Sequence, residues 1–263
     1  GQFSFSTCGS GVVLYPYATN PFTAGTPVTI PANGTMNNVT VCSGGGGGGT
    51  GTVTDIDGNT YNTVQIGTQE WMQENLKTTK YKNGDVIPTN LNNTQWQSTT
   101  QGAWAYYNDS SQYNNIYGKL YNWYAVADAR GVCPTGWHVP TDSEWNVLVK
   151  QLDPQADTTD SSYSQSLIAG GFMKAVGDLQ SGTGLWQSPN YGATNSSGFT
   201  GLPGGDRNLY GSYLYIGYYG YWWSASEILT DYAWYRSLDY SDAFVYRNAY
   251  FKRLGFSIRC LRD

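Results

Sequence analysis

The sequence predicts an α+β protein in which an extended arm precedes a larger folded domain. Residues 1–43 contain short alternating apolar segments, residues 44–53 are rich in glycine, and residues 54–263 combine helix and strand patterns. We therefore expect an N-terminal β-type arm over residues 1–43, a hinge over residues 44–53, and one domain over residues 54–263. The domain is long enough to bury a sizeable core.

The predicted arm is a series of short β segments interrupted by prolines. Its alternating apolar residues are Phe3, Phe5, Val28, Ile30, Val39 and Val41. Prolines confine such strands to sheet edges or bends, because proline cannot donate a ladder hydrogen bond. A segment of about 43 residues is too short to bury a stable core by itself. We therefore expect the arm to pack against another surface through these alternating residues.

The hinge contains consecutive glycines from Gly44 to Gly49, which favour a flexible tether because glycine loses the most backbone entropy on ordering. Ten residues of such chain span roughly 17 Å on average and about 35 Å at full extension. That length is enough to cross a subunit boundary. A contact in which each molecule donates at one end and accepts at another does not close on itself in general, so it propagates into a filament.

The domain begins with a predicted hairpin, because Asp57, Gly58 and Asn59 supply turn residues between two alternating runs. From Phe199 onward, short aromatic strands alternate with glycine-rich turns. These patterns favour irregular antiparallel sheets.

Two or three helices are predicted between these strand regions. The first covers residues 118–129, and a weaker one covers residues 164–176. The clearest covers residues 141–152, where Thr141 and Glu144 form a capping box. Trp145, Leu148 and Leu152 form the buried stripe of that helix.

Charge and hydropathy exclude two classes of partner. The chain has 14 Lys and Arg against 19 Asp and Glu, so no basic surface is expected for nucleic acid or anionic lipid. No apolar run reaches the length of about 18 residues that a spanning helix needs, so we expect no membrane insertion. The chain begins without an initiator Met, as a secreted protein does after its targeting segment is removed. We expect an extracellular or cell-surface location.

The even number of cysteines agrees with an oxidising compartment. Of the three pairings that four cysteines allow, we predict Cys8 with Cys42 and Cys133 with Cys260. None of the spacings is CxxC, so we expect no zinc site.

Six segments follow one another in the order and spacing of a bacterial family. They are DIDGNTYNTVQIGTQEWMQENL, GKLYNWYAV, CPTGWHVPTDSEW, GFTGLPGGDRN, YWWSAS and GFSIRCLRD. Residues 54–263 thereby resemble the Fibrobacter succinogenes major paralogous domain, whose members are similar to cell-surface or secreted bacterial proteins. The resemblance implies a distant relation to the C-type-lectin-like and formylglycine-generating folds, with helices packed on irregular antiparallel sheets. It does not by itself imply an activity.

The formylglycine-generating relatives use a reactive cysteine pair with copper, for which Cys133 and Cys260 would be the candidates here. A structural disulfide is the favoured interpretation, because paired cysteines in secreted domains are structural as a rule. His138 is the only histidine, which is too few for a His-based metal cluster or a catalytic triad. Its large apolar neighbours predict a hydrogen-bonded core residue. We therefore predict a non-enzymatic protein without a metal or cofactor.

Calcium-dependent sugar binding of the C-type lectin kind requires a cluster of oxygen ligands. The triplets Glu-Pro-Asn and Gln-Pro-Asp are absent, and Trp-Asn-Asp is present only in altered form at residues 107–109. Residues 55–59 have the acid spacing of a calcium loop, but the glycine stands at the fourth position instead of the sixth. A hairpin turn is the simpler interpretation. Asp142 and Glu144 are explained by the preference of acids for helix N-termini.

Residues 210–224 are unusually rich in aromatic side chains. Core packing can use about half of these rings, and the alternation of a strand turns the others outward, where they suit sugar stacking or subunit contacts. The candidate ligand or interface residues are Tyr215, Tyr218, Tyr219, Tyr221, Trp222 and Trp223. Candidate glycosylation triplets, a weak signal in a chain rich in Asn and Thr, begin at Asn33, Asn38, Asn92, Asn108 and Asn195.

Taken together, these features predict a subunit of a bacterial surface filament that donates its arm to the next copy of itself. The alternative is a cell-surface adhesin or carbohydrate-binding module that uses exposed Tyr and Trp side chains to bind surface glycans. An oxidase-type enzyme is the third hypothesis, which free thiols at Cys133 and Cys260 would favour.

Overall fold

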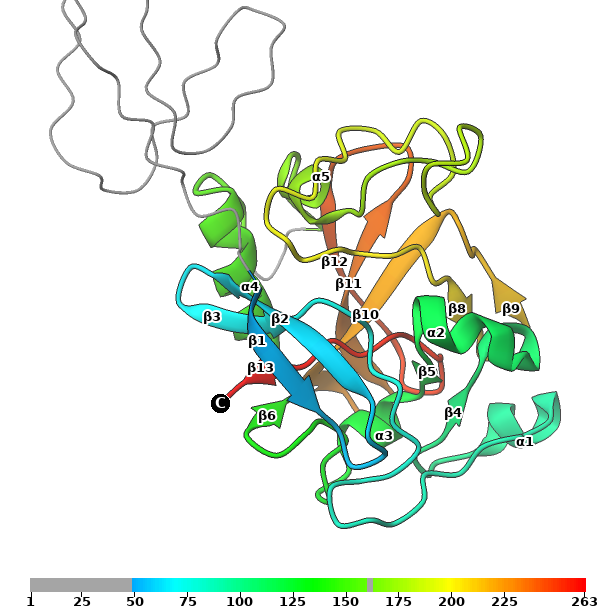
Figure 1. Cartoon of the computed structure of the whole chain (residues 1–263). Helices are drawn as coiled ribbons and strands as arrows, with labels where there is room; N and C mark the ends of the chain where they lie inside the picture. Colours follow the sequence, from blue (N-terminus) through cyan, green and yellow to red (C-terminus); the bar gives the residue numbers. More distant parts are fainter. Residues whose placement is uncertain (1–48, 160–162) are drawn as a thin grey trace, which may run out of the picture. The chain divides into compact units, whose positions relative to one another are not determined.

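The computed structural model describes residues 49–159 and 163–263, and every structural statement below concerns these residues (Figure 1). The predicted arm with its six candidate contacts, the Cys8–Cys42 pairing and the triplets at Asn33 and Asn38 lie outside them.

The secondary structure is mixed. The strands are β1 (Gly49–Thr54), β2 (Thr60–Ile66), β3 (Gln69–Met72), β4 (Trp104–Ala105), β5 (Leu120–Tyr121), β6 (Trp137–His138), β7 (Ser164–Ser166), β8 (Asp206–Arg207), β9 (Tyr213–Leu214), β10 (Tyr219–Leu229), β11 (Tyr232–Asp239), β12 (Val245–Phe251) and β13 (Leu261–Arg262). The helices are α1 (Asn93–Ser98), α2 (Asn114–Tyr117), α3 (Trp123–Val126), α4 (Asp142–Leu152) and α5 (Ala169–Met173), with short 3-10 turns at Tyr107–Asp109 and Ser111–Tyr113. The predicted α+β class is confirmed.

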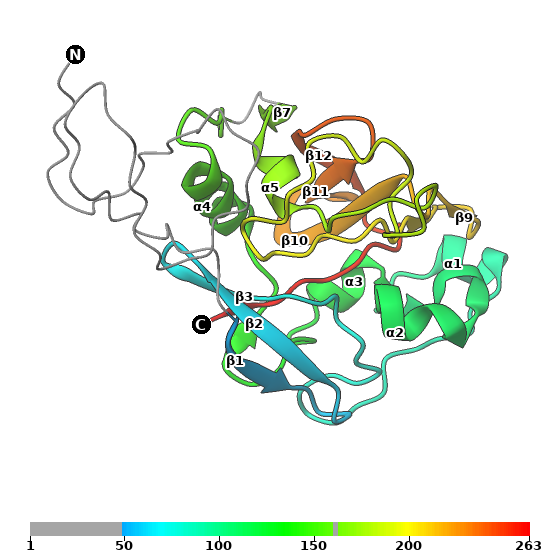
Figure 2. The same ribbon diagram turned by 45° about the horizontal axis from the view of Figure 1, so that its top comes forward.

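Two antiparallel sheets organise the domain. The five-stranded sheet has the order β1-β2-β3-β13-β6, so strands from the beginning and the end of the described chain meet in one sheet. The four-stranded sheet has the order β10-β11-β12-β7, and β4-β5 and β8-β9 form two small ribbons. Figures 1 and 2 show α4 on one side of the long strands β10 to β12.

The predicted hairpin is confirmed as β1 and β2, which pair antiparallel from Thr54↔Thr60 to Gly49↔Val64. Gly58 in the connecting turn has a φ of +85°, a left-handed conformation that glycine adopts without strain.

The predicted helix at residues 141–152 is confirmed as α4, and both hydrogen bonds of its Thr141–Glu144 capping box are present. Trp145, Leu148 and Val149 are its buried residues, whereas the predicted stripe residue Leu152 is only half-buried.

The other two helix predictions are wrong over most of their length. Within residues 118–129 the chain first forms β5, which pairs with β4, and only then the short helix α3. Asn122 separates the two elements, because its side chain accepts hydrogen bonds from the backbone N–H groups of Ala103 and Ala125. Residues 164–176 form β7 and a single short helix, α5, instead of one continuous helix.

The core has two large clusters of buried apolar residues. One joins α4 to the inner faces of both sheets through Trp145, Trp71 and Trp222, and the other surrounds Tyr121 and Phe256. Arg259, fully buried between these regions, donates two hydrogen bonds to Asn75 Oδ1, at 2.8 Å from Nη2 and 3.2 Å from Nε. Among the described helices, none has the length and apolar character to cross a membrane.

Candidate functional site

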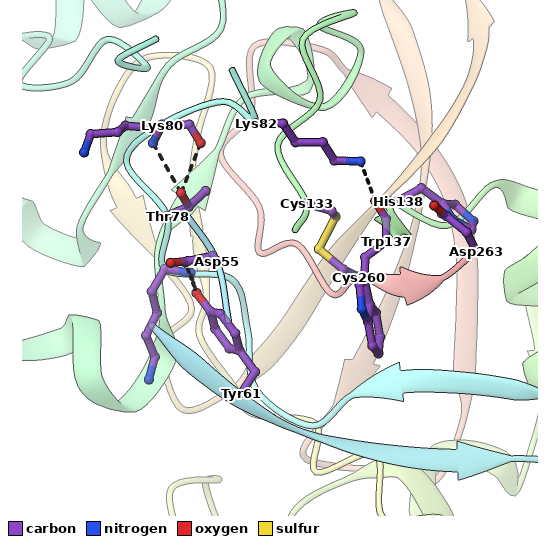
Figure 3. The surroundings of a disulfide bond; sticks show 11 residues. Asp55, Tyr61, Thr78, Lys80, Lys82, Cys133, Trp137, His138, Cys260 and Asp263 are labelled. Atoms are coloured by element: carbon purple, nitrogen blue, oxygen red, sulfur yellow. Dashed lines mark hydrogen bonds and ion pairs between the residues drawn. A yellow bond between two sulfur atoms is a disulfide. The ribbon is translucent and has the colours of Figure 1, made fainter. Parts of the chain in front are cut away.

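The predicted Cys133–Cys260 disulfide is confirmed (Figure 3). Both cysteines are buried, and the bond ties the segment before β6 to the segment before β13 across 127 residues of sequence. Closing a loop of that length stabilises a fold by about 5 kcal/mol in the chain-entropy description. Nearby, Lys82 Nζ donates to the backbone oxygen of Trp137 at 2.7 Å (Figure 3). The Cys133–Cys260 disulfide therefore cross-links the segments that lead into two strands of the five-stranded sheet.

The prediction that His138 is a core residue is wrong. Its side chain is about a third exposed, at 34%. Its two ring nitrogens lie 2.7 Å from Asp263 Oδ1 and 3.0 Å from Glu144 Oε1. The alternation of the short strand β6 explains the error, because Trp137 takes the buried side and His138 the outer one.

The turn interpretation of residues 55–59 is supported by the hydrogen bonds of Asp55. Its carboxylate accepts from the backbone N–H groups of Asp57 and Asn59, from the Asn59 side chain, and from the Tyr61 hydroxyl at 2.7 Å. Within residues 49–159 and 163–263, no three His, Cys, Asp or Glu side chains gather as a metal site would require. Asp55 thus fixes the turn and the start of β2.

Two depressions mark the surface of the domain. One, of 220 Å³, adjoins the end of β1 and the disulfide, and is lined by Thr54, Asp55, Ile56, Lys82, Val132, Cys133, Pro134 and Thr135. The other, of 300 Å³, lies beside β3 and β13 and includes Glu144 and Asp263. Pockets that enclose a small-molecule ligand measure roughly 300–1,000 Å³, so the first depression is below that range and the second is at its lower end. An extended surface is therefore the better place to look for a binding function.

The aromatic residues of segment 210–224 divide between the core and the surface. The prediction that Trp222 and Trp223 are ligand or interface residues is wrong. Trp222 and Trp223 are fully buried, so neither can stack on a ligand at the surface. The Trp222 indole N–H donates to Asn75 Oδ1 at 2.9 Å, and that of Trp223 donates to the Tyr121 backbone oxygen at 2.8 Å. Simple alternation fails here because the strand is covered on both sides near its middle.

The remaining candidates divide by exposure. Tyr215 and Tyr218 are exposed, at 49% and 42%, whereas Tyr219 and Tyr221 are half-buried. The rings of Tyr215, Tyr219 and Tyr221 follow one another at centroid distances of 5.4 and 5.6 Å. The segment thus presents a row of tyrosines at one end of β10.

Other tyrosines join this row on one face of the four-stranded sheet. Residues paired across neighbouring strands lie on the same face of a sheet, and alternate residues along one strand also lie on the same face. On this basis the face carries Tyr219 and Tyr221 of β10, Tyr235 of β11, and Tyr246 and Tyr250 of β12, together with the fully buried Trp223. Tyr163, just before β7, joins the tyrosines of the face through its ring contact with Tyr246. We call these six tyrosines the tyrosine face.

Ring contacts connect the tyrosine face across the strands. The ring centroids of Tyr221 and Tyr235 are 5.9 Å apart, and those of Tyr163 and Tyr246 are 5.1 Å apart. Tyr163 and Tyr250 are the most exposed members, at 57% and 41%. The face therefore combines accessible ring area with phenolic hydroxyls, which serve as both donors and acceptors.

Carboxylates border the tyrosine face. The Tyr246 hydroxyl donates to Asp242 Oδ2 at 2.6 Å. Burial, together with the charge of Asp239 and a hydrogen bond to it, raises the pKa of Tyr219 to about 12. The phenols consequently stay neutral at physiological pH and act as hydrogen-bonding groups.

Asp206 of β8 lies close enough to influence Tyr221, whose pKa is raised by burial and then by the Asp206 charge. Only 5% of Asp206 is exposed, and within the described part of the chain its Oδ1 has no hydrogen-bond partner. Burial raises the pKa of Asp206 to about 7. Gly205 before it has a φ of +64°, and a Cβ there would lie 2.3 Å from the Leu214 backbone oxygen. That close approach explains the second glycine of the PGGDRN segment.

The three described glycosylation triplets differ in accessibility. Asn92 and Asn108 are exposed, and Asn92 also caps α1 by accepting from the Gln95 backbone N–H. Asn195 is half-buried, and its side-chain amide donates to Thr200 Oγ1 at 3.0 Å. Attachment of a glycan at Asn195 would replace one of the two hydrogens of this donor nitrogen.

Most of the tyrosine face escaped prediction from the sequence. Tyr219 and Tyr221 were among the candidates, but Tyr163, Tyr235, Tyr246 and Tyr250 were not. The signal that could have found three of these is the alternation in YAWYRSLD and VYRNAYF, the sequences of β11 and β12. Asp206 gave no such signal, because its burial depends on distant segments.

Comparison with known proteins places the chain in a family. Residues 64–262 match the Fibrobacter succinogenes major domain, Fib_succ_major, and the chain belongs to this family. Neither a curated protein nor a solved structure matches the chain.

Proposed function

We propose that the protein is a non-enzymatic subunit of an extracellular bacterial filament, in which residues 1–43 of one copy dock on the domain of the next. The observation that carries the proposal is the distribution of charge along the chain. All 14 Lys and Arg and all 19 Asp and Glu residues occur at or after Asp55. An uncharged, strand-patterned segment of this length loses no ion hydration when it docks, and it cannot form a stable core alone.

The structure is compatible with donation at the junction. The described chain begins with β1, which stands at the edge of the five-stranded sheet and starts at Gly49, the last glycine of the run, so residues 49–53 of the predicted hinge form a strand. This strand is anchored in the sheet, so a pull on the arm is transmitted to a disulfide-stapled body. We also propose a C-type-lectin-like arrangement for the domain, which is supported by the pairing of β13 with β3. A buried disulfide favours an extracellular location.

Electron microscopy of the purified full chain, beside a version lacking residues 1–43, tests the filament proposal. We expect filaments from the full chain and none from the shortened one. A matched pair of full-length variants separates docking from folding. Val39→Lys with Val41→Lys places charges on the apolar side of a predicted strand, whereas Asn38→Lys with Thr40→Lys places them on the other side. Loss of filaments from the first variant alone supports the proposal, and monomers from the unmodified chain contradict it.

The second candidate function is binding of a surface glycan, and the observation that favours it is the tyrosine face. Tyrosine rings flanked by carboxylates offer stacking area and hydrogen-bond acceptors for sugar hydroxyls. A glycan array with the full chain tests it. Binding that Tyr250→Ala abolishes, and that the Tyr210→Ala variant retains, would favour this function.

A further inference from the structure

We propose that the tyrosine face is the surface that receives the arm, and that its occupant is the proline-containing stretch, residues 13–31, of a neighbouring copy. This inference rests on the proposed filament function and names the acceptor surface within it.

The chemistry of the two surfaces fits. Residues 13–31 contain four prolines, at Pro16, Pro21, Pro27 and Pro31, and the arm has no charged side chain. Segments with frequent prolines favour extended polyproline conformations, which leave backbone carbonyls free to accept hydrogen bonds. Aromatic-lined surfaces recognise such segments, because rings pack on proline and ring hydroxyls donate to the carbonyls. The tyrosine face supplies both rings and hydroxyls on one side of a sheet.

Charge on the sheet favours an uncharged occupant. The two arginines of the sheet, Arg236 and Arg247, bind Asp142 of α4 on the opposite face, at 2.7 and 2.8 Å. Asp239 accepts from the backbone N–H and the hydroxyl of Ser241, and Asp242 accepts from Tyr246. These carboxylates already have partners, so the face presents neutral donors and apolar ring surface. An acidic peptide would lose hydration there and meet these carboxylates as like charges, whereas an uncharged segment loses no ion hydration.

The attachment point of the arm favours docking between copies. Gly49, where the described chain begins, pairs with Val64, and Val64 packs in the same cluster as Trp145 of α4. Because α4 covers the face opposite the tyrosine face, Gly49, the first described residue, lies on the side of the sheet away from the tyrosine face. Donation on one side and acceptance on the other generates a head-to-tail assembly.

Dityrosine cross-linking provides a direct test, because the arm itself contains Tyr15 and Tyr17. Equal amounts of unlabelled and ¹⁵N-labelled full chain are assembled together and photo-oxidised with a ruthenium sensitiser and persulfate. Cross-linked peptides are then identified by mass spectrometry. We expect links of mixed isotope composition that join the peptide containing Tyr15 and Tyr17 to peptides of β10, β12 or Tyr163. Links confined to a single isotope would place the arm on its own domain and overturn the inference.

Full-length variants complete the test. Tyr163→Ala with Tyr250→Ala removes the two most exposed rings of the face, and Tyr210→Ala, at 63% exposure in the turn between β8 and β9, is the matched control. We expect the double variant to lower filament yield at least fivefold and the control to leave it unchanged. If all three proteins form filaments and the cross-links lie elsewhere, this inference is wrong and the filament proposal stands. If the unmodified chain forms no filaments, both fail.

Discussion

The two faces of the four-stranded sheet differ in how deeply their large side chains are buried. On the face toward α4, Trp222, Arg236 and Arg247 are all buried and each has a specific polar partner. On the tyrosine face, Tyr235 and the neighbouring Trp223 are buried, Tyr219, Tyr221 and Tyr246 are half-buried, and Tyr163 and Tyr250 are exposed. The α4 face is therefore a closed core, whereas the tyrosine face is closed around Trp223 and Tyr235 and open around Tyr163 and Tyr250, where its composition is that of an interface.

The carboxyl groups of Asp142, on the α4 side, and Asp206, near the tyrosine face, have pKa values that are shifted in opposite directions. Burial raises the pKa of Asp142, but hydrogen bonds and charge from Arg247 and Arg236 outweigh it, so the pKa is lowered overall. Asp206 has no such partner among the described residues, and burial raises its pKa to about 7. The ion pairs of Asp142 on the α4 side stabilise the fold, whereas the burial of Asp206 near the tyrosine face, without such a partner, costs stability.

The largest expected effect is that of Trp222→Ala on the α4 side. Removal of this buried ring leaves a cavity and takes away one of the three hydrogen bonds that Asn75 Oδ1 accepts, the other two coming from Arg259, so we expect the free energy of unfolding to fall by about 3–5 kcal/mol. Urea denaturation measures the change, with Tyr215→Ala as the exposed control. A loss below about 1 kcal/mol for Trp222→Ala would show that the α4 face is not the closed core described here.

Asp206→Asn should alter the dependence of stability on pH. Because the folded pKa of about 7 lies above the ordinary value of 3.8, the carboxyl group favours folding at low pH. That contribution is fully present below about pH 4 and is lost as pH rises through 7. At about 1.4 kcal/mol per pKa unit, the loss is at most about 4 kcal/mol. The variant should therefore gain stability relative to the native chain between pH 4.5 and 8, as measured by urea midpoints at each pH.

A parallel pH dependence in the native chain and the Asn variant would contradict this expectation. Asp142 serves as the comparison of opposite sign. Its lowered pKa contributes stability at neutral pH that is lost as pH falls through the folded pKa.

A smaller effect is expected at the start of α4. Thr141→Ala removes the side chain that accepts from the Glu144 backbone N–H and donates to Glu144 Oε2 at 2.8 Å. Loss of such a cap destabilises a helix by about 1 kcal/mol. Thr141→Ser, which keeps the hydroxyl, should recover most of the lost stability in thermal unfolding. If Ser behaves as Ala does, the cap is not the source of the effect.

The features that the sequence predicted correctly are those determined by neighbouring residues or by simple pairing. The β1–β2 turn depends on Gly58, α4 depends on the Thr141–Glu144 box, and the Cys133–Cys260 bond is one of few pairings. The wrong predictions depend on distant segments. Residues 118–129 carry a helical pattern, yet pairing with β4 draws their first part into a strand.

The aromatic segment shows the same limit. The adjacent residues Tyr221 and Trp222 are both aromatic, but Trp222 is covered by α4 and the 199–205 segment. On the other side of β10, Tyr221 is half-buried against Tyr235 and Phe256, whereas Trp223 on that same side is fully buried. Which face a second layer covers is decided by the whole fold, so the tyrosine face could not be separated from the core by alternation alone.

The smallest change in stability is expected on the tyrosine face, and it tests most directly whether this face is a surface or part of the core. Tyr163→Ala with Tyr250→Ala removes exposed rings from the tyrosine face, so we expect the unfolding free energy to change by less than about 0.5 kcal/mol per site. Differential scanning calorimetry of the full chain at low concentration, where assembly is minimal, measures this intrinsic stability. If the double variant is as unstable as Trp222→Ala, the tyrosine face is part of the core. If stability is retained and assembly or ligand binding is lost, the rings are present on this face for a partner.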